Sequence, residues 1–179
     1  MSDRATHGRD ADDPLPSWSA LVNVYQTVLH DVVAALDEQA GTDSGVFSAL
    51  AYLERARPPH RLPMGELQRA MHPRYSQPGF SRLVQRMEAD GLVERRPDAA
   101  DRRATIVVTT RAGRTQFRDA NAVYVAALRT SFGRHLRAGD HARLAAILSR
   151  VTAHREGGRS QVAAAGSLRM RSPKPTSAS

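Results

Sequence analysis

The polar side chains whose types and spacing could do chemistry lie between Ser76 and Arg103. Apolar residues recur there at helical spacing and predict a buried helix face, made of Phe80, Leu83, Val84 and Met87. The opposite face then carries Gln77, Ser81, Arg82, Gln85 and Arg86. In a major groove Gln can pair with adenine and Arg with guanine, so this helix is predicted to read DNA. We expect Gln77 and Ser81 to contact bases, and Arg82 or Arg86 to contact phosphate. The alternative is an ordinary solvated helix face.

Local signals set the limits of this reading helix. Ser76 can cap its first free N–H groups, Pro78 fits the first turn, and Gly91 ends it. Two short β patterns follow, over residues 92–96 and 104–109, joined by a polar loop. A hairpin this short must lean on the helices, which leaves its tip free to reach DNA. Arg95 and Arg96 fit a backbone contact and a plain surface charge equally well.

The segment before the reading helix is predicted to be helical after a disordered arm of residues 1–16. Ser17 is the expected cap of a long first helix, which closes at about Gly41. Its apolar stripe is wide enough to pack on a partner chain as well as on its own core. Further helices are expected over residues 43–55 and 64–71, and the turn 72–75 then leads into the reading helix.

After the hairpin, Thr110 is the expected cap of a second long helix, whose stripe runs from Phe117 to Leu136. Gly139 and Asp140 break it and begin a final helix. Residues 157–179 are rich in Ser, Ala and basic residues and are predicted to be a disordered tail.

The charge of the chain is distributed unevenly. The net charge is +8 over 179 residues, but residues 1–54 hold 2 Arg and 9 acids. Residues 55–103 hold 11 Arg and 6 acids, and residues 104–179 hold 13 basic residues and 3 acids. Genomic bias can explain the preference for Arg over Lys but not this asymmetry. A basic segment attracts phosphate, so the pattern favours nucleic-acid binding over a merely basic surface.

Several function classes lack support in the sequence. There is no cysteine, Gly-rich phosphate loop or Gly-x-Ser-x-Gly elbow, so we expect neither catalytic residues nor a cofactor. The seven His residues are scattered without metal-binding spacing, so no metal is expected. No apolar run is long enough for a membrane span, and the acidic N-terminus does not look like a signal peptide. A cytoplasmic protein with no membrane partner is the expectation.

The order of helices and hairpin resembles the MarR family of bacterial transcription regulators. The run from Gly79 to Glu88 is similar to that family's recognition helix, and Asp90 to Arg95 resembles its helix-to-wing junction. Asp101-Arg102-Arg103 matches the wing pattern of Asp, any residue, Arg. Val108 to Gly113 matches the family's passage from the second wing strand to the following helix, with Thr109 where Leu is more usual.

This resemblance implies a mainly α fold with a small β-hairpin wing, a winged helix–turn–helix with a helical dimerisation region. The MarR-like domain would cover residues 17–156, with its DNA-binding winged helix at about 43–110. The helices over 17–40 and 110–156 would pair two copies into a homodimer. Arg103 would enter a minor groove, with Asp101 bracing it or a neighbouring Arg, which fits the negative potential of narrow grooves.

The resemblance also implies a cleft for a small-molecule effector. Its candidate residues are Trp18, Tyr25, Phe47 and Ser48, although core or dimer packing is the favoured role of Trp18 and Tyr25. Ser48 stands where many relatives carry Asp. The turn His72-Pro73-Arg74-Tyr75 is about two residues longer than usual, which either changes the angle of the reading helix or brings Arg74 and Tyr75 to a phosphate.

The predicted function is therefore a sequence-specific, ligand-responsive repressor that binds double-stranded DNA as a homodimer. The DNA-contacting residues would be Tyr75, Ser76, Gln77, Ser81, Arg82, Arg86, Asp101 and Arg103. The alternative is a winged-helix module that binds DNA without sequence preference or binds other proteins.

Overall fold

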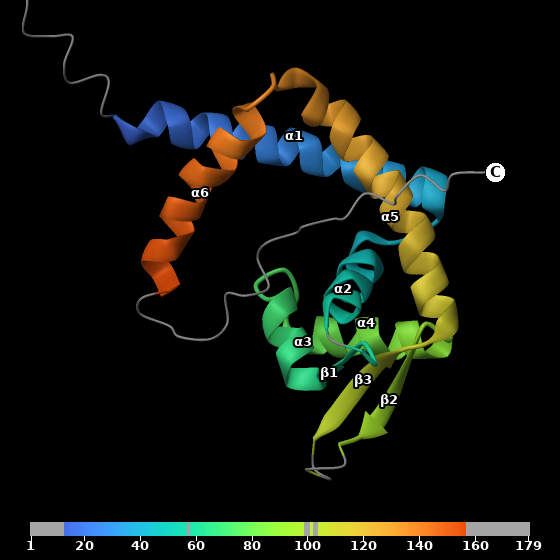
Figure 1. The fold of residues 1–179 in the computed structure, drawn as a ribbon. Helices are drawn as coiled ribbons and strands as arrows, with labels where there is room; N and C mark the ends of the chain where they lie inside the picture. The colour runs from blue at the N-terminus through green and yellow to red at the C-terminus, as the bar shows by residue number, and fades with distance from the viewer. Residues whose placement is uncertain (1–12, 57, 99–100, 102–103, 157–179) are drawn as a thin grey trace, which may run out of the picture.

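The computed structural model describes residues 13–56, 58–98, 101 and 104–156. Figure 1 shows an upper helical layer and a lower lobe. The upper layer contains α1 (Pro14–Ala40), α5 (Arg111–Ser131) and α6 (Asp140–Glu156). The lower lobe contains α2 (Ser44–Arg55), α3 (Met64–Met71), α4 (Gln77–Ala89) and a small sheet. The predicted fold class, a mainly α winged helix–turn–helix, is confirmed.

The sheet has three antiparallel strands rather than the two predicted. They are β1 (Arg61–Pro63), β2 (Val93–Pro97) and β3 (Thr105–Thr109), in the spatial order β1-β3-β2. The strand β1 escaped prediction because it has only three residues and ends in proline, which removes a backbone donor. Pairing of Leu62 with Val107 ties the hairpin to the start of α3. The wing is therefore anchored on one side before it leaves the lobe.

The lower core is built by α2, α3, α4 and the sheet. The four apolar residues predicted on the inner face of α4 are all buried, with exposed fractions of 0–4%: Phe80, Leu83, Val84 and Met87. They pack with Leu50 and Leu53 of α2 and with Leu67 of α3. Because one complete face of α4 is committed to this core, its other face is left for solvent or a ligand.

A second cluster joins the lobe to the upper layer. Phe47 of α2 is buried beside Val32 and Leu36 of α1. Its ring also stacks on Phe117 and Tyr124 of α5, with centroid separations of 5.7 and 4.9 Å. The lobe and the long helices are thus joined through aromatic contacts around one residue of α2.

Two predicted boundaries are wrong. The helix α1 begins at Pro14, and the carboxylate of Asp13, not the hydroxyl of Ser17, caps it by accepting from Leu15 N at 3.0 Å. Proline is tolerated in a first turn because the N–H groups there have no partner within the helix, so residues 14–16 extend the helix instead of the arm. The helix α5 ends at Ser131, and a short 3-10 turn, Gly133–His135, precedes α6.

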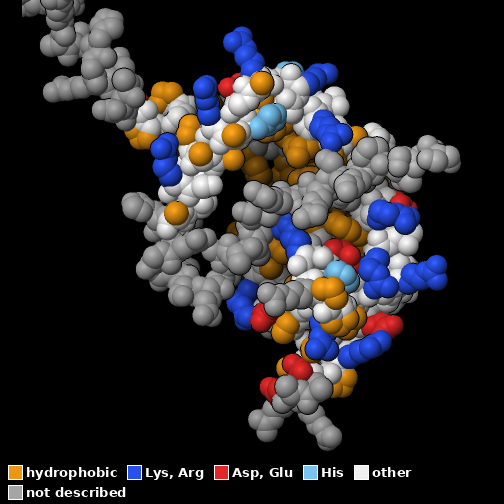
Figure 2. Space-filling model, in the orientation of Figure 1, with side chains coloured by type: hydrophobic (Ala, Val, Ile, Leu, Met, Phe, Trp, Pro, Cys, Tyr) orange, Lys and Arg blue, Asp and Glu red, His pale blue; other side chains and the backbone are white. Residues whose placement is uncertain are grey.

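The upper layer carries apolar side chains that are exposed in the described part of the chain. Trp18 is 62% exposed and Val151 is 68% exposed, with Leu15, Leu21, Val24, Tyr25 and Ile147 also exposed. Figure 2 shows hydrophobic side chains on the surface of α6 and at the N-terminal end of α1. Within the described part of the chain, α6 makes no extensive contact with another element. None of the helices in the same residues is long and apolar enough to cross a membrane.

Candidate nucleic-acid interface

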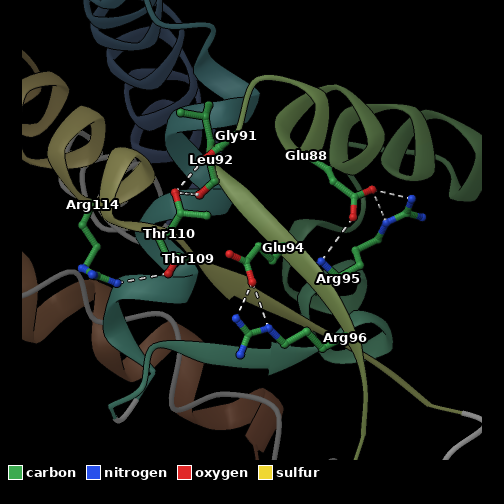
Figure 3. A network of polar contacts seen from close by, with 9 residues as sticks. All are labelled: Glu88, Gly91, Leu92, Glu94, Arg95, Arg96, Thr109, Thr110 and Arg114. Atoms are coloured by element: carbon green, nitrogen blue, oxygen red, sulfur yellow. Dashed lines mark hydrogen bonds and ion pairs between the residues drawn. The ribbon is translucent and has the colours of Figure 1, made fainter.

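The helix α4 is held in a defined position at both ends. Ser76 caps it, with its hydroxyl accepting from Gly79 N at 3.3 Å. Gly91 ends it in the left-handed region at φ 68°, which a residue with a side chain adopts only at a cost. Beyond Gly91, the hydroxyl of Thr110 donates to the Gly91 carbonyl at 2.7 Å (Figure 3). The same hydroxyl caps α5 by accepting from Gly113 N. One threonine therefore joins the end of α4 to the start of α5.

The outer face of α4 presents the residues that the sequence predicted there. Gln77, Arg82 and Gln85 are exposed, whereas Ser81 is half-buried. Among the described residues, no ion pair or hydrogen bond of the Arg82 guanidinium is formed. Arg82 is therefore available as a cation for an external anion such as a DNA phosphate.

The other arginines near α4 are paired within the protein. Arg86 reaches Asp43, the cap of α2, at 3.3 Å. Arg95 pairs with Glu88, and Arg96 pairs with Glu94 within the same strand (Figure 3). Arg86, predicted to contact DNA, thus has a structural partner that the sequence did not reveal, because the two residues are far apart along the chain. Contact of Arg86 with DNA stays a prediction.

Tyr75 lies in the structure as a packing residue. It is half-buried against the lower core, and burial raises the pKa of its hydroxyl, with Asp43 adding to the effect. Its hydroxyl lies so near α2 that a Cβ added to Gly45 would meet it at 1.9 Å. Glycine at position 45 therefore allows the turn before α4 to dock on α2.

The wing carries the remaining predicted residues. Asp101 is exposed, and its carbonyl accepts from Ala104 N at 2.8 Å, which closes the hairpin at that point. Arg103 lies outside the described residues. The base of β2 is joined to α4 by Glu88, whose carboxylate accepts from both the side chain and the backbone N–H of Arg95. Hydrogen bonding from Arg95 lowers the pKa of Glu88 below its ordinary value.

A cleft of about 640 Å³ lies between the upper layer and the lobe. It brings together three of the four predicted effector residues, Tyr25, Phe47 and Ser48, but Trp18 does not line it. The Ser48 hydroxyl donates to the Ser44 carbonyl at 2.7 Å and accepts from Arg74 Nη1 at 3.2 Å. Ser48 is therefore engaged in contacts of its own, and it ties the turn before α4 to the wall of the cleft.

The cleft also contains residues that the sequence did not predict there. Tyr52, Arg55 and Tyr124 line it together with Arg74. Burial raises the pKa of the Tyr124 hydroxyl, while Arg55 and Arg74 act in the opposite direction. These residues come from three separate elements, so no spacing in the sequence could have grouped them. The result is a largely apolar cleft whose lining includes two arginines.

The fold and this site define a winged helix–turn–helix protein, with α4 as the reading helix and the β2–β3 hairpin as the wing. Residues 40–104, from the last residue of α1 to the residue before β3, match the model of the MarR family. Over these residues the chain is similar to the MarR family of transcription regulators. A comparison with curated proteins finds no match.

Solved structures of MarR family regulators share the fold over most of their length. AbsC from Streptomyces coelicolor is 24% identical, with a TM-score of 0.69 over 87% of this chain and 99% of that chain. Sco3205 from the same organism, solved in complex with DNA, is 23% identical, with a TM-score of 0.68 over 82% and 92%. BpsR from Bordetella bronchiseptica, whose DNA binding is regulated by 6-hydroxynicotinic acid, is 18% identical, with a TM-score of 0.62 over 75% and 91%.

Proposed function

We propose that the chain is a sequence-specific repressor that binds a near-palindromic operator as a homodimer and responds to a small ligand. The observation that carries this proposal is the outer face of α4. A helix fixed on the core by Phe80 and Met87 presents Gln77, Arg82 and Gln85 to solvent beside a wing. Exposed amide and guanidinium groups on one helix face are the donors that read base edges in a major groove.

The proposed contacts divide between recognition and attachment. Gln77 and Ser81 read bases, and Arg82 contacts phosphate or guanine. Ser76 lies at the N-terminus of α4, where the helix dipole favours a phosphate. Asp101 and Arg103 act at the wing tip, with Arg103 in a minor groove. For Tyr75 we favour a positioning role, because its hydroxyl is directed to Gly45 of α2.

The proposed second copy covers the apolar faces of α1 and α6. Trp18 and Val151 are each more than half exposed, and large apolar patches of this kind mark interfaces. A two-fold dimer would place two copies of α4 in successive major grooves, about 10 bp apart. The expected operator is therefore an inverted repeat of that spacing.

The proposed effector is an aromatic or aliphatic molecule with one anionic group. The cleft offers Phe47 and Tyr124 to the apolar part, and Arg55 and Arg74 to the charge. Repression would end if the ligand favours a dimer whose α4 spacing does not fit the operator. A near-complete switch requires about 5.5 kcal/mol of preference for that state.

Selection of bound duplexes from a pool of random sequences tests the proposal, because the operator need not be known in advance. The full chain should enrich an inverted repeat with half-sites about 10 bp apart. Failure to enrich any sequence would refute sequence-specific binding.

A non-specific DNA-binding module is the second candidate, favoured by the 13 basic residues against 3 acids in residues 104–179. Removal of residues 158–179 separates the two functions. Binding that disappears entirely with this segment would assign the affinity to the segment and not to α4.

A further inference from the structure

Glu88, near the end of α4, makes a contact that links the two elements proposed to touch DNA. We propose that the Glu88–Arg95 pair holds the wing at one angle to the reading helix, and that Glu88 is a positioning residue for DNA recognition. The consequence for DNA rests on the proposed DNA-binding function. The claim that this pair fixes the angle between α4 and β2 does not depend on DNA binding, and it can be measured without DNA.

The carboxylate of Glu88 holds both the side chain and the backbone of Arg95. Its Oε2 accepts from Arg95 Nε at 2.7 Å, and its Oε1 accepts from the backbone N–H of Arg95 at 3.3 Å (Figure 3). In the order β1-β3-β2, the strand β2 has a partner on one side only. Glu88 therefore satisfies a backbone donor on the open edge of β2, where a further strand would otherwise bind.

Few other interactions fix the outer part of this strand to α4. Val93 is the one buried residue of β2, and the four residues from Glu94 to Pro97 are exposed. Apolar packing thus holds the base of the strand, and the Glu88 contact lies two residues farther toward the tip. An error in the angle at the base grows along the hairpin, so a charge-assisted contact at this point controls where the tip lies.

A carboxylate on a DNA-facing surface repels phosphate and by itself weakens DNA binding. Removing the charge of Glu88 would raise the net charge by one, which by itself favours binding to any DNA. A positioning role predicts the opposite for an operator, because α4 and the wing must fit the duplex together. The two effects therefore differ in sign, and this difference distinguishes them.

Glu94 provides a matched control. It is also an exposed carboxylate that pairs with an arginine, but its partner, Arg96, belongs to the same strand, so the pair does not join β2 to α4. Glu88→Gln and Glu94→Gln change the net charge equally. We expect Glu88→Gln to lower the ratio of operator affinity to scrambled-DNA affinity about twofold to fivefold, the scale of an exposed ion pair. Glu94→Gln should leave this ratio unchanged.

The angle itself can be measured in the DNA-free full chain. The chain has no cysteine, so Gln85→Cys and Thr105→Cys give unique sites for two spin labels on α4 and β3. Labelled protein diluted with unlabelled chain reports distances within one copy by pulsed dipolar spectroscopy. Glu88→Gln should broaden the distribution, and Glu94→Gln should not. The exchanged pair Glu88→Arg with Arg95→Glu keeps an ion pair but loses the acceptor for the backbone N–H of residue 95, so it should narrow the distribution only in part.

Identical distributions for wild type and Glu88→Gln would overturn the positioning role, whatever the DNA titrations show. If Glu88→Gln broadens the distribution but the wild-type chain binds operator and scrambled DNA equally, the positioning role of Glu88 is retained and the proposed function is refuted.

Discussion

Replacement of Gly45 by alanine tests how the turn before α4 is docked on α2. The added Cβ would meet Tyr75 Oη at 1.9 Å, Tyr75 Cζ at 2.8 Å and Asp43 Oδ1 at 2.9 Å. Two of these atoms belong to a rigid ring packed on the core, so the ring must shift together with the backbone of the turn. Asp43 must also move, although its carboxylate caps α2 by accepting from Gly45 N and Val46 N.

Two terms of opposite sign set the size of the effect. Alanine in place of glycine favours a helix by at most about 1 kcal/mol. Overpacking of a filled site costs about 1–3 kcal/mol. The clash at Tyr75 is far inside ordinary contact distance, so we take the upper part of that range. Gly45→Ala should then lower the free energy of unfolding by about 1–2 kcal/mol.

Gly65→Ala is the matched control, because Gly65 also lies in the first turn of a helix but has open space. Its added Cβ would have one neighbour, Arg69 Nη1, at 3.6 Å, which is an ordinary contact. Urea unfolding followed by circular dichroism should show Gly65→Ala at or above wild-type stability and Gly45→Ala below it. In a Tyr75→Leu background the penalty at position 45 should shrink. Equal stability of the two alanine variants would refute the docking role of Gly45.

Three further predictions follow from individual contacts. Arg82→Ala should weaken operator binding by about 1–3 kcal/mol and reduce the slope of log affinity against log salt concentration by about one. Arg96→Ala removes a cation that is already paired, so it should change both quantities less in the same titration. Thr110→Ala should lower the free energy of unfolding by about 1 kcal/mol, because the cap of α5 and the bond to Gly91 are lost together. Thr110→Ser keeps the hydroxyl, so urea unfolding should show a stability close to that of wild type. The pKa of Glu88 is lowered by Arg95, so its stabilising contribution is present above the ordinary pKa of 4.5 and is lost as the pH falls through the lowered value. The stability difference between wild type and Glu88→Gln should therefore vanish under acidic conditions, and a difference that persists there would contradict the assignment.

The fold could be predicted from the sequence where one periodicity or one cap dominates. The stripe of α4 and the caps Ser76 and Thr110 are local signals, and the structure contains each of them. The predicted start of α1 is wrong because Pro14 and Pro16 look like helix breakers, although a first turn accepts proline. The strand β1 exists only through its pairing with β3, and three residues carry no recognisable pattern.

The site was harder to predict because its partners are distant in the sequence. Helical spacing indicated that Arg82 and Arg86 would both point outward, but only tertiary structure shows that Asp43 pairs with Arg86. The cleft likewise depends on residues from α1, α2, α5 and the turn before α4. Spacing along the chain reports which face a residue occupies, and it carries no information about which distant group meets it there.

The central claim is that α4 and the wing recognise one DNA sequence. The most direct measurement is the affinity of the full chain for the selected inverted repeat and for a scrambled duplex of the same length, at one salt concentration. We predict a preference of about 10³-fold or more for the repeat. Equal affinities for the two duplexes would contradict the claim.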